Sequence, residues 1–269
     1  MDQATDTLLL YKSIAVGGWF ALLFVLERVW PAAPRVGLEE RSDGRIGDRR
    51  RLGRNAGLWL VNLGLGPLFV IPVSAWAAGW GPGLRPDWWA GWPGLIADLI
   101  LLDFLIYWWH RANHTIPFLW RFHEIHHLDR FLDTTSAVRF HAGEVALSAL
   151  FRAGVIVLFG IPIASVLAFE VAVLAAALFH HSNLRLPPGL ERGLSRVVIT
   201  PSIHWIHHHA TRVDTDSNYG TILSVWDPLF GSRNRRAREL DMVIGVEGEA
   251  ERGFLDLLAR PFQARPPAA

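Results

Sequence analysis

The chain has 269 residues, of which 51% are hydrophobic and only 19% are charged, with a formal net charge of +1. This composition excludes a disordered or collagen-like chain, and the balanced charge gives no basic face for nucleic acid. The absence of cysteine excludes disulfides and thiolate metal sites, so a bound metal would take nitrogen and oxygen ligands.

Long apolar runs and thirteen tryptophans indicate a protein that crosses a membrane several times. A helix needs about 20 mostly apolar residues to span the hydrocarbon core. In chain order, the runs cover residues 8–27, 56–80, 94–109 and 143–180. The second should bend at Pro67 and Pro72, and the last is long enough for a hairpin that turns at residues 160–162. We therefore predict an all-α, multi-pass membrane bundle with about four to five spans, two of them paired as a hairpin.

The distribution of arginine predicts the orientation of these spans. The loop 35–54 holds seven arginines against four acidic residues, whereas the loop 81–93 holds only Arg85. Loops rich in arginine and lysine stay in the cytoplasm, so 35–54 is expected inside and 81–93 outside. Threading the later spans places residues 110–142 and 181–269 in the cytoplasm. We therefore expect a multi-pass protein of a bacterial inner membrane, with its polar cap on the cytoplasmic face.

All twelve histidines lie between residues 110 and 209, on that one predicted face. His110 and His114 form an HxxxH pair, and two HxxHH triplets begin at His123 and His204. On a helix, residues three or four positions apart share a face, so each cluster can chelate a metal. A single HxxxH arises often by chance, but two triplets and a pair at helix ends do not. His141 lies outside these clusters, and the sequence fits a metal ligand and an ordinary polar residue about equally well at this position.

The number of histidines predicts two metal ions. Imidazole suits iron, copper, nickel and zinc, which take four to six ligands each, and the three clusters already offer eight histidines. Two such ions beside a lipid-embedded cavity suggest redox chemistry on a hydrophobic substrate, with iron as the metal if O2 is activated. The sequence contains no nucleotide or flavin fingerprint, so electrons are expected from a separate donor.

The motifs between residues 95 and 232 resemble the fatty acid hydroxylase/sterol desaturase superfamily of membrane di-iron oxygenases. They are Asp103, YWWHRANH at 107–114, LWRFHEIHH at 119–127, RFH at 139–141, HSN at 181–183, TPSIHWIHH at 200–208, NYG at 218–220 and WDPLFG at 226–231. The resemblance implies a catalytic region at 94–232, after N-terminal membrane helices at 1–93 and before a polar C-terminal tail at 233–269.

The resemblance also implies roles for individual residues. The core iron ligands would be His110, His114, His123, His126, His127, His204, His207 and His208. His181 would be a ninth ligand, with His180 and His141 as weaker candidates. His209, at a position where a small residue is usual, is expected beside the site or exposed. Asp103, Asp214, Asp227 and Asn218 would orient the metal-bound imidazoles, although Asp214 and Asp227 could equally be loop and turn residues.

Two functions remain open from the sequence. The first is an oxygenase that uses O2, two iron ions and electrons from a ferredoxin or a reductase to hydroxylate or desaturate a lipid; zinc could replace iron in recombinant protein. The second is a membrane metal-binding or transport protein that uses the same histidines. A transporter should carry its ligands inside the spans, whereas these histidines gather at one face, which favours the oxygenase. The substrate could be a sterol, a fatty acyl chain, an ether lipid or a carotenoid.

Overall fold

The computed structural model describes residues 3–34, 48–80 and 85–263, and within these ranges the chain forms helices and loops without a β-strand. The all-α prediction is thus confirmed. The elements in chain order are α1 (Gln3–Val29), α2 (Asp48–Leu65), η1 (Gly66–Val70), α3 (Ile71–Ala78), α4 (Gly91–Thr115), α5 (Pro117–His127), η2 (Thr134–Val138), α6 (Ala142–Phe159), α7 (Ile163–His181), α8 (Pro188–Leu194), α9 (Pro201–His207), α10 (Arg212–Thr215), α11 (Trp226–Leu229), α12 (Phe254–Ala259) and η3 (Arg260–Phe262).

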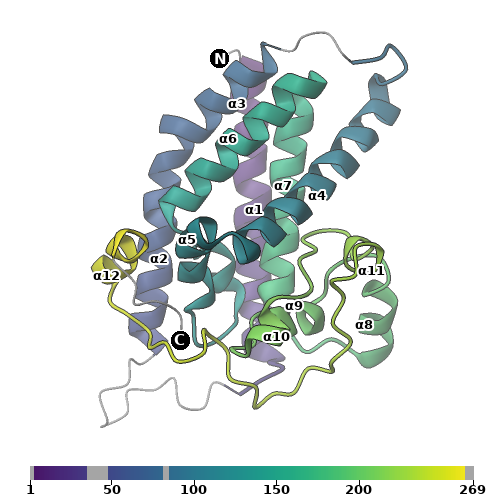
Figure 1. The fold of residues 1–269 in the computed structure, drawn as a ribbon. Helices are drawn as coiled ribbons and strands as arrows, with labels where there is room; N and C mark the ends of the chain where they lie inside the picture. Colours follow the sequence, from purple (N-terminus) through teal and green to yellow (C-terminus); the bar gives the residue numbers. More distant parts are fainter. Residues whose placement is uncertain (1–2, 35–47, 81–84, 264–269) are drawn as a thin grey trace.

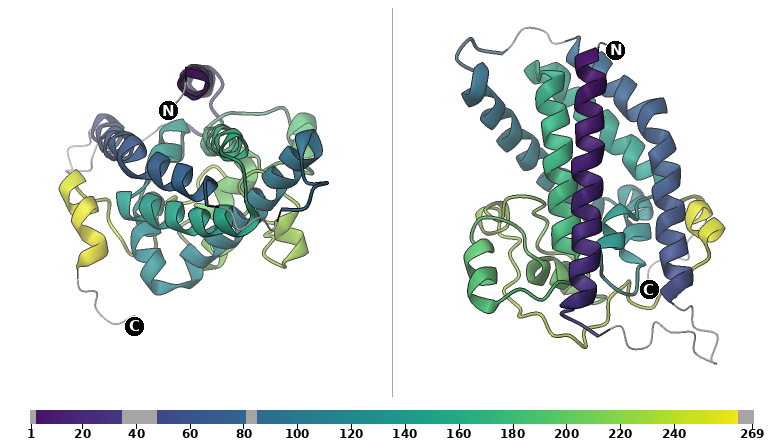
Figure 2. Two further views of the ribbon diagram at one scale, coloured as in Figure 1. Left: turned by 90° about the horizontal axis from the view of Figure 1, so that it is seen from above. Right: turned by 180° about the vertical axis from the view of Figure 1, so that it is seen from behind.

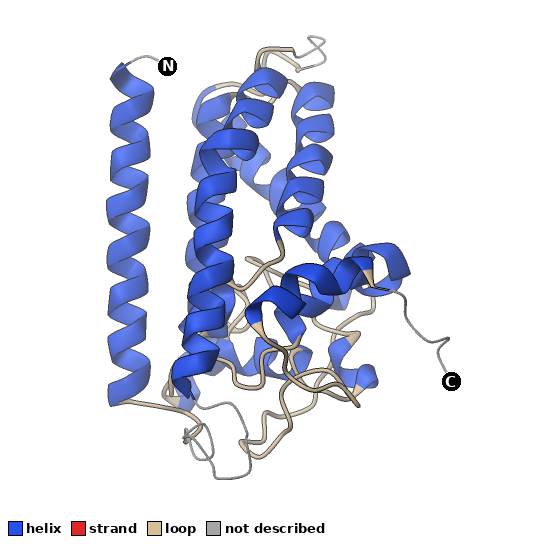
Figure 3. Ribbon diagram, turned by 90° about the vertical axis from the view of Figure 1, so that its left-hand side faces the viewer, coloured by secondary structure: helices blue, strands red, loops and turns tan. Residues whose placement is uncertain are grey.

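Long helices form a bundle with a cap of short helices at one end (Figure 1). Four helical stretches are long and apolar enough to cross a membrane, namely 49–78, 91–115, 142–159 and 163–181. The last two are the predicted hairpin, which turns at Gly160 with φ 60°. The α1 helix lies at the first predicted span and runs beside α7 at the edge of the bundle (Figures 2 and 3). The side chains of residues 3–12 in that span lie outside the described ones.

The second span is one continuous helical stretch with a π-helical turn in its middle. The turn η1 contains Pro67, which has no N–H to donate. The backbone widens there, and the N–H of Ile71 donates to the carbonyl of Gly66. Pro72 stands in the first turn of α3, where a missing N–H is tolerated. The predicted bend at the two prolines is therefore a local change of helical winding.

The third span extends past its predicted end and carries the first histidines with it. The α4 helix continues to Thr115, so His110 and His114 lie on the same rigid helix as the apolar segment. The helix stops at Ile116, whose backbone is extended (φ −99°, ψ 113°). Proline disfavours the helical conformation in the residue before it, and Pro117 follows directly. The chain turns there, and α5 packs back against α4.

A buried ion-pair network fixes the loop that follows α5. Arg51 of α2 is almost wholly buried, and its guanidinium donates to the carboxylates of Asp129 and Asp133 and to the carbonyl of Phe131. Arg139 donates to the carbonyl of Ile125 and to the side chain of Asn55. These bonds join α2 to the segment directly after the second histidine cluster, so that α5 is held at its C-terminal end.

The residues after 232 also pack against the body of the protein. Met242 and Ile244 join a buried cluster with Trp205 of α9. Leu257 of α12 packs against α2, and Arg260 pairs with Glu124 of α5. The part of the expected polar tail that the structure describes therefore covers the outer surface of α5 and α9.

Candidate metal centre

Nine histidines from four helices converge in two adjacent groups at the capped end of the bundle. Within each group, one ring nitrogen of every histidine lies within 4.8 Å of one ring nitrogen of every other. The first group is His110, His114, His123, His127 and His207, and the second is His126, His181, His204 and His208. All of the histidines that the sequence assigns to core ligands, and His181 as the ninth, lie in these groups.

The spacing within each triplet distributes its members between the two groups. On α5, His123 and His127 are four residues apart and both enter the first group, while His126 enters the second. On α9 the division is reversed, because His207 enters the first group while His204 and His208 enter the second. The rings of His127 and His208 stack with their centroids 4.3 Å apart, so the two groups are in direct contact.

In the first group, four histidines have Nδ1 held by the protein. Nδ1 of His110 lies 2.8 Å from the carbonyl oxygen of Tyr219, and Nδ1 of His207 lies 2.7 Å from that of Ser217. A carbonyl oxygen only accepts, so both Nδ1 atoms carry the proton. Carboxylate oxygens take the same place at His123 (Glu144, 2.8 Å) and His114 (Asp216, 3.2 Å). Each Nε2 is thereby left as a lone pair.

These lone pairs are buried and point at one another. Among the described residues, Nε2 of His114, His123 and His207 has no hydrogen-bond partner, and neither ring nitrogen of His127 has one. Burying polar atoms without partners costs free energy, and unpaired buried groups in native proteins are rare. A metal ion bound by the Nε2 atoms would satisfy these four Nε2 atoms at once.

In the second group, too, the ring nitrogens that face one another need a cation between them. Nδ1 of His126 lies 3.2 Å from the carbonyl oxygen of Arg139, and Nδ1 of His181 lies 2.8 Å from that of Ala177. Both protons are thus on Nδ1, yet the two Nε2 atoms are 3.0 Å apart. Two lone pairs at that distance repel unless a proton or a cation lies between them. Burial lowers the pKa of the His126 imidazole well below its ordinary value, which argues against a proton.

The distances fit a metal ion. The Nε2 atoms of His181 and His204 are 3.0 Å apart, and those of His204 and His208 are 3.1 Å apart. Two imidazole nitrogens at right angles on an ion, each about 2.1 Å from it, are separated by roughly 3.0 Å. Burial also lowers the pKa of His207, to about 3, and that of His208, so both rings stay neutral and able to bind a metal. The residues present therefore fit two metal ions.

A short loop supplies two of the carbonyl groups that hold the first group. Ser217 and Tyr219 point their carbonyls at His207 and His110, and between them Asn218 has a positive φ of 54°. Asparagine tolerates this left-handed conformation better than most residues. Asp227 accepts hydrogen bonds from the N–H groups of Tyr219 and Gly220 and so holds the loop in place. Asn218 and Asp227 therefore act on the histidines through the backbone.

The other two carboxylates expected to orient the histidines contact different partners. Asp103 of α4 accepts from the N–H groups of Ile222 and Leu223 and from the indole of Trp226, and so anchors the same loop to the bundle. Asp214 lies 2.6 Å from Nδ1 of His209, outside both groups. His209 is buried beside the centre, in agreement with its expected place next to the site.

The two weaker histidine candidates lie outside the groups. Nδ1 of His141 accepts from the N–H of Gly143 and caps α6, and its Nε2 lies 3.1 Å from the carbonyl oxygen of Leu258. Both of its nitrogens are thus occupied by the backbone. The ring of His180 packs 4.0 Å from that of His204, measured between centroids, without joining the second group.

Sequence reasoning missed the two carboxylates that do contact histidines of the groups. Glu144 is in the first turn of α6, and Asp216 follows α10. The position of Glu144, three residues after the RFH motif and inside an apolar run, is a signal that could have identified it, because an acidic residue there needs a buried partner. Asp216 lies in the polar segment 211–218, where nothing in the sequence distinguishes it from the other polar residues.

Comparison with known proteins agrees with this centre. A family model described as fatty acid hydroxylase matches residues 95–232. Ornithine lipid hydroxylase of Rhizobium tropici is 29% identical over 199 residues, which cover 74% of this chain and 59% of that protein. Alkylglycerol monooxygenase of Danio rerio is 32% identical over 162 residues, or 60% and 34% of the two chains.

A third relative is named for a different reaction. Very-long-chain aldehyde decarbonylase GL1-5 of Oryza sativa subsp. indica is 29% identical over 165 residues, which cover 58% of this chain and 26% of that protein. The chain thus spans less than two thirds of the length of each of these relatives. No solved structure matches it.

Proposed function

The chain belongs to the fatty acid hydroxylase family, and we propose that it is a membrane-bound di-iron oxygenase that hydroxylates a lipid. The observation that carries the proposal is the convergence of nine histidines in two groups. In the first group, Nε2 of His114, His123, His127 and His207 has no partner among the described residues. In the second group, the Nε2 atoms lie 3.0–3.1 Å from one another. A purely structural cluster would pair these nitrogens with donors and acceptors of the protein.

Each group would hold one ion. The first ion would be bound by His110, His114, His123, His127 and His207, and the second by His126, His181, His204 and His208. Imidazole suits iron and zinc alike, so zinc can occupy the site in recombinant protein. Two iron ions, when bound, would supply the activation of O2 that the oxidation of an unactivated C–H bond requires.

Other residues of the chain would hold the imidazoles in the orientation and tautomer that metal binding requires. Glu144 and Asp216 hold His123 and His114 in the tautomer that leaves Nε2 free, and the carbonyls of the 217–219 loop do the same for two more rings. Such outer partners orient a ligand and raise its basicity. Because eight of the nine histidines are buried and His110 is partly buried, bulk water is also largely kept away from the centre.

The balance of the reaction defines the partners. Inserting one oxygen atom of O2 into a C–H bond yields an alcohol, and reducing the other atom to water consumes two electrons and two protons. A separate donor, a ferredoxin or a reductase, would supply the electrons. Two relatives are named as a lipid hydroxylase and an alkylglycerol monooxygenase. These names favour hydroxylation over desaturation. They also favour an acyl or alkyl chain as the substrate.

The centre would lie at the cytoplasmic face of a bacterial inner membrane. All nine histidines are at the same end of the bundle as the start of α2, where arginines 49, 50, 51 and 54 are found. Positively charged segments flanking a span remain in the cytoplasm. A soluble electron donor could reach the centre from that side.

A comparison of lipid extracts tests the function. Cells that express the chain should contain a lipid heavier by one oxygen atom, which is absent from cells without it. The matched pair His208→Ala and His209→Ala separates the metal groups from their surroundings, since the two residues are adjacent and only His208 belongs to a group. The first variant should lose the product and the second should retain it. A product lighter by two hydrogen atoms would instead indicate desaturation, and no changed lipid would contradict the proposal.

A further inference from the structure

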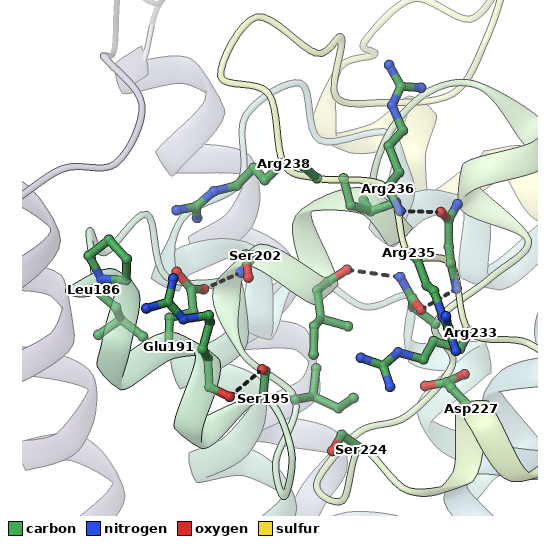
Figure 4. A pocket seen from close by; sticks show the side chains of 18 of the residues that line it. Leu186, Glu191, Ser195, Ser202, Ser224, Asp227, Arg233, Arg235, Arg236 and Arg238 are labelled. Atoms are coloured by element: carbon green, nitrogen blue, oxygen red, sulfur yellow. Dashed lines mark hydrogen bonds between the residues drawn. The ribbon is translucent and has the colours of Figure 1, made fainter.

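A pocket lined with arginine lies on the face of α9 that points away from the histidines. It has a volume of about 690 Å³ and is enclosed by α8, α9 and the segment 233–238 (Figure 4). Figure 4 shows Arg233 and Arg235 across the pocket from Glu191 and Ser195 of the α8 region, whereas the side chain of Arg238 extends toward Glu191. Pockets of about 300–1,000 Å³ are the size that small ligands occupy.

The pocket concentrates positive charge in a chain that is nearly neutral as a whole. Its lining contains two acidic residues and six arginines, namely Arg185, Arg192, Arg233, Arg235, Arg236 and Arg238. Arg236 is paired with Asp214 and Glu239. Within the described part of the chain, the guanidinium groups of Arg185, Arg192, Arg233 and Arg235 take part in no hydrogen bond or ion pair.

Arg238 lies at a less exposed position, where Glu191 attracts its guanidinium without forming a hydrogen bond. Its guanidinium lies 5.8 Å from the ring centroid of Trp205, and its Nη1 is buried without a hydrogen-bond partner in the described residues. Burial lowers the pKa of this guanidinium. A buried cation of this kind is stabilised by an anion bound beside it.

The two acidic residues of the lining are engaged with the backbone. Glu191 accepts from the N–H of Ser202 at the start of α9. Asp227 accepts from the N–H groups of Tyr219 and Gly220 and from the hydroxyl of Ser232. Neither carboxylate forms a hydrogen bond with an arginine of the lining. Although Glu191 attracts Arg238, six arginines against two acidic residues leave the lining with an excess of positive charge.

We propose that this pocket binds a phosphate ester, either the headgroup of an anionic phospholipid or a soluble phosphate. Guanidinium groups match the oxygens of phosphate in charge and geometry and bind them through paired hydrogen bonds. The hydroxyls of Ser195, Ser202 and Ser224 offer further donors. A concave pocket of this volume suits a small ligand better than the flat surface of an acidic protein. The pocket contains none of the nine histidines, although Asn218 and Asp227 of its lining also belong to the loop that supports them. The proposal does not depend on the proposed oxygenase activity.

Binding to the full-length protein in neutral detergent tests the proposal, with native mass spectrometry to count bound molecules. The probes are inorganic phosphate, short-chain phosphatidylglycerol and short-chain phosphatidylcholine. The test variant combines Arg233→Gln and Arg235→Gln, since neither guanidinium has a partner whose loss would disturb the fold. The control is Arg196→Gln, which removes an equally exposed arginine near the end of α8 but outside the lining. Thermal unfolding of each variant checks that the fold is intact.

The double variant should bind the anionic probes at least about tenfold more weakly, because each charge-assisted hydrogen bond lost costs about that factor. The control should bind as the unchanged protein does. Binding of phosphatidylglycerol alone identifies a lipid headgroup, and binding of inorganic phosphate identifies a soluble ester; both support the proposal. Polyglutamate is added as a fourth probe to represent an acidic peptide. The proposal is overturned if neither anionic lipid nor phosphate binds, if the unchanged protein and the two variants bind equally, or if only polyglutamate binds through these arginines.

Discussion

Nδ1 of His123 lies 2.8 Å from Oε1 of Glu144, a carboxylate that reaches the metal centre from the first turn of the neighbouring helix. The same oxygen also accepts from the side-chain amide of Asn113. Glu144 therefore joins α4, α5 and α6 at one atom. Its position determines which nitrogen of His123 faces the first group of histidines.

The first prediction is that Glu144→Ala lowers metal affinity without removing a ligand. Loss of such an outer partner costs about 10–100-fold in affinity, and Glu144→Gln should lose less because its amide oxygen still accepts. Titration against a chelator measures the change. Glu239→Ala, which removes an exposed acidic residue that contacts none of the nine histidines, is the control. Equal affinity in all three variants would mean that Glu144 does not orient His123.

The second prediction concerns the buried arginine that holds the loop after α5. Arg51→Met leaves the buried carboxylates of Asp129 and Asp133 without their cation and should lower the free energy of unfolding by about 3–5 kcal/mol. Arg49→Met removes an exposed arginine two residues earlier on the same helix and should change it little. Thermal unfolding in detergent compares the two. Equal midpoints for both variants would show that the network is not needed to hold the loop.

The helices and most of the histidines could be predicted from the sequence because each depends on local spacing. The spans follow from runs of apolar residues, and HxxHH places its members on one side of a helix whatever the surroundings. The family resemblance rests on the same local motifs and is confirmed by the match to residues 95–232.

The partners of the carboxylates could not be predicted because they are set by packing between distant segments. Asp214 and Asp216 look alike in the sequence, yet the first reaches His209 and the second reaches His114. The division of each triplet between two groups is equally non-local, since His126 meets His181 across 55 positions of the chain. Only the fold decides which ring belongs to which group.

A third prediction separates His141 from the metal ligands. His141→Ala should leave metal content unchanged and should lower the free energy of unfolding by about 1 kcal/mol, because α6 loses its N-cap. His141→Asn should recover most of that loss, since asparagine is a good N-cap. Metal analysis and thermal unfolding of both variants give the answer. A metal ion missing from His141→Ala would place this residue among the ligands.

A fourth prediction tests the orientation in the membrane. The described spans run so that the loop containing residue 87 lies at one end and all nine histidines lie at the other (Figure 1). Reporter fusions at residue 45 and at the C-terminus should both read cytoplasmic, and one at residue 87 should read external. A C-terminus on the outside would place the centre away from cytoplasmic electron donors and would exclude the proposed route of electrons.

The central claim is that the two histidine groups each bind one metal ion, and the metal content of purified, folded protein tests it most directly. Elemental analysis should find close to two transition-metal ions per chain, with iron in the active form. His208→Ala should fall below two, because it removes a ligand of the second group, whereas His209→Ala should keep both ions. One ion or none in the folded, unchanged protein would contradict the di-metal centre.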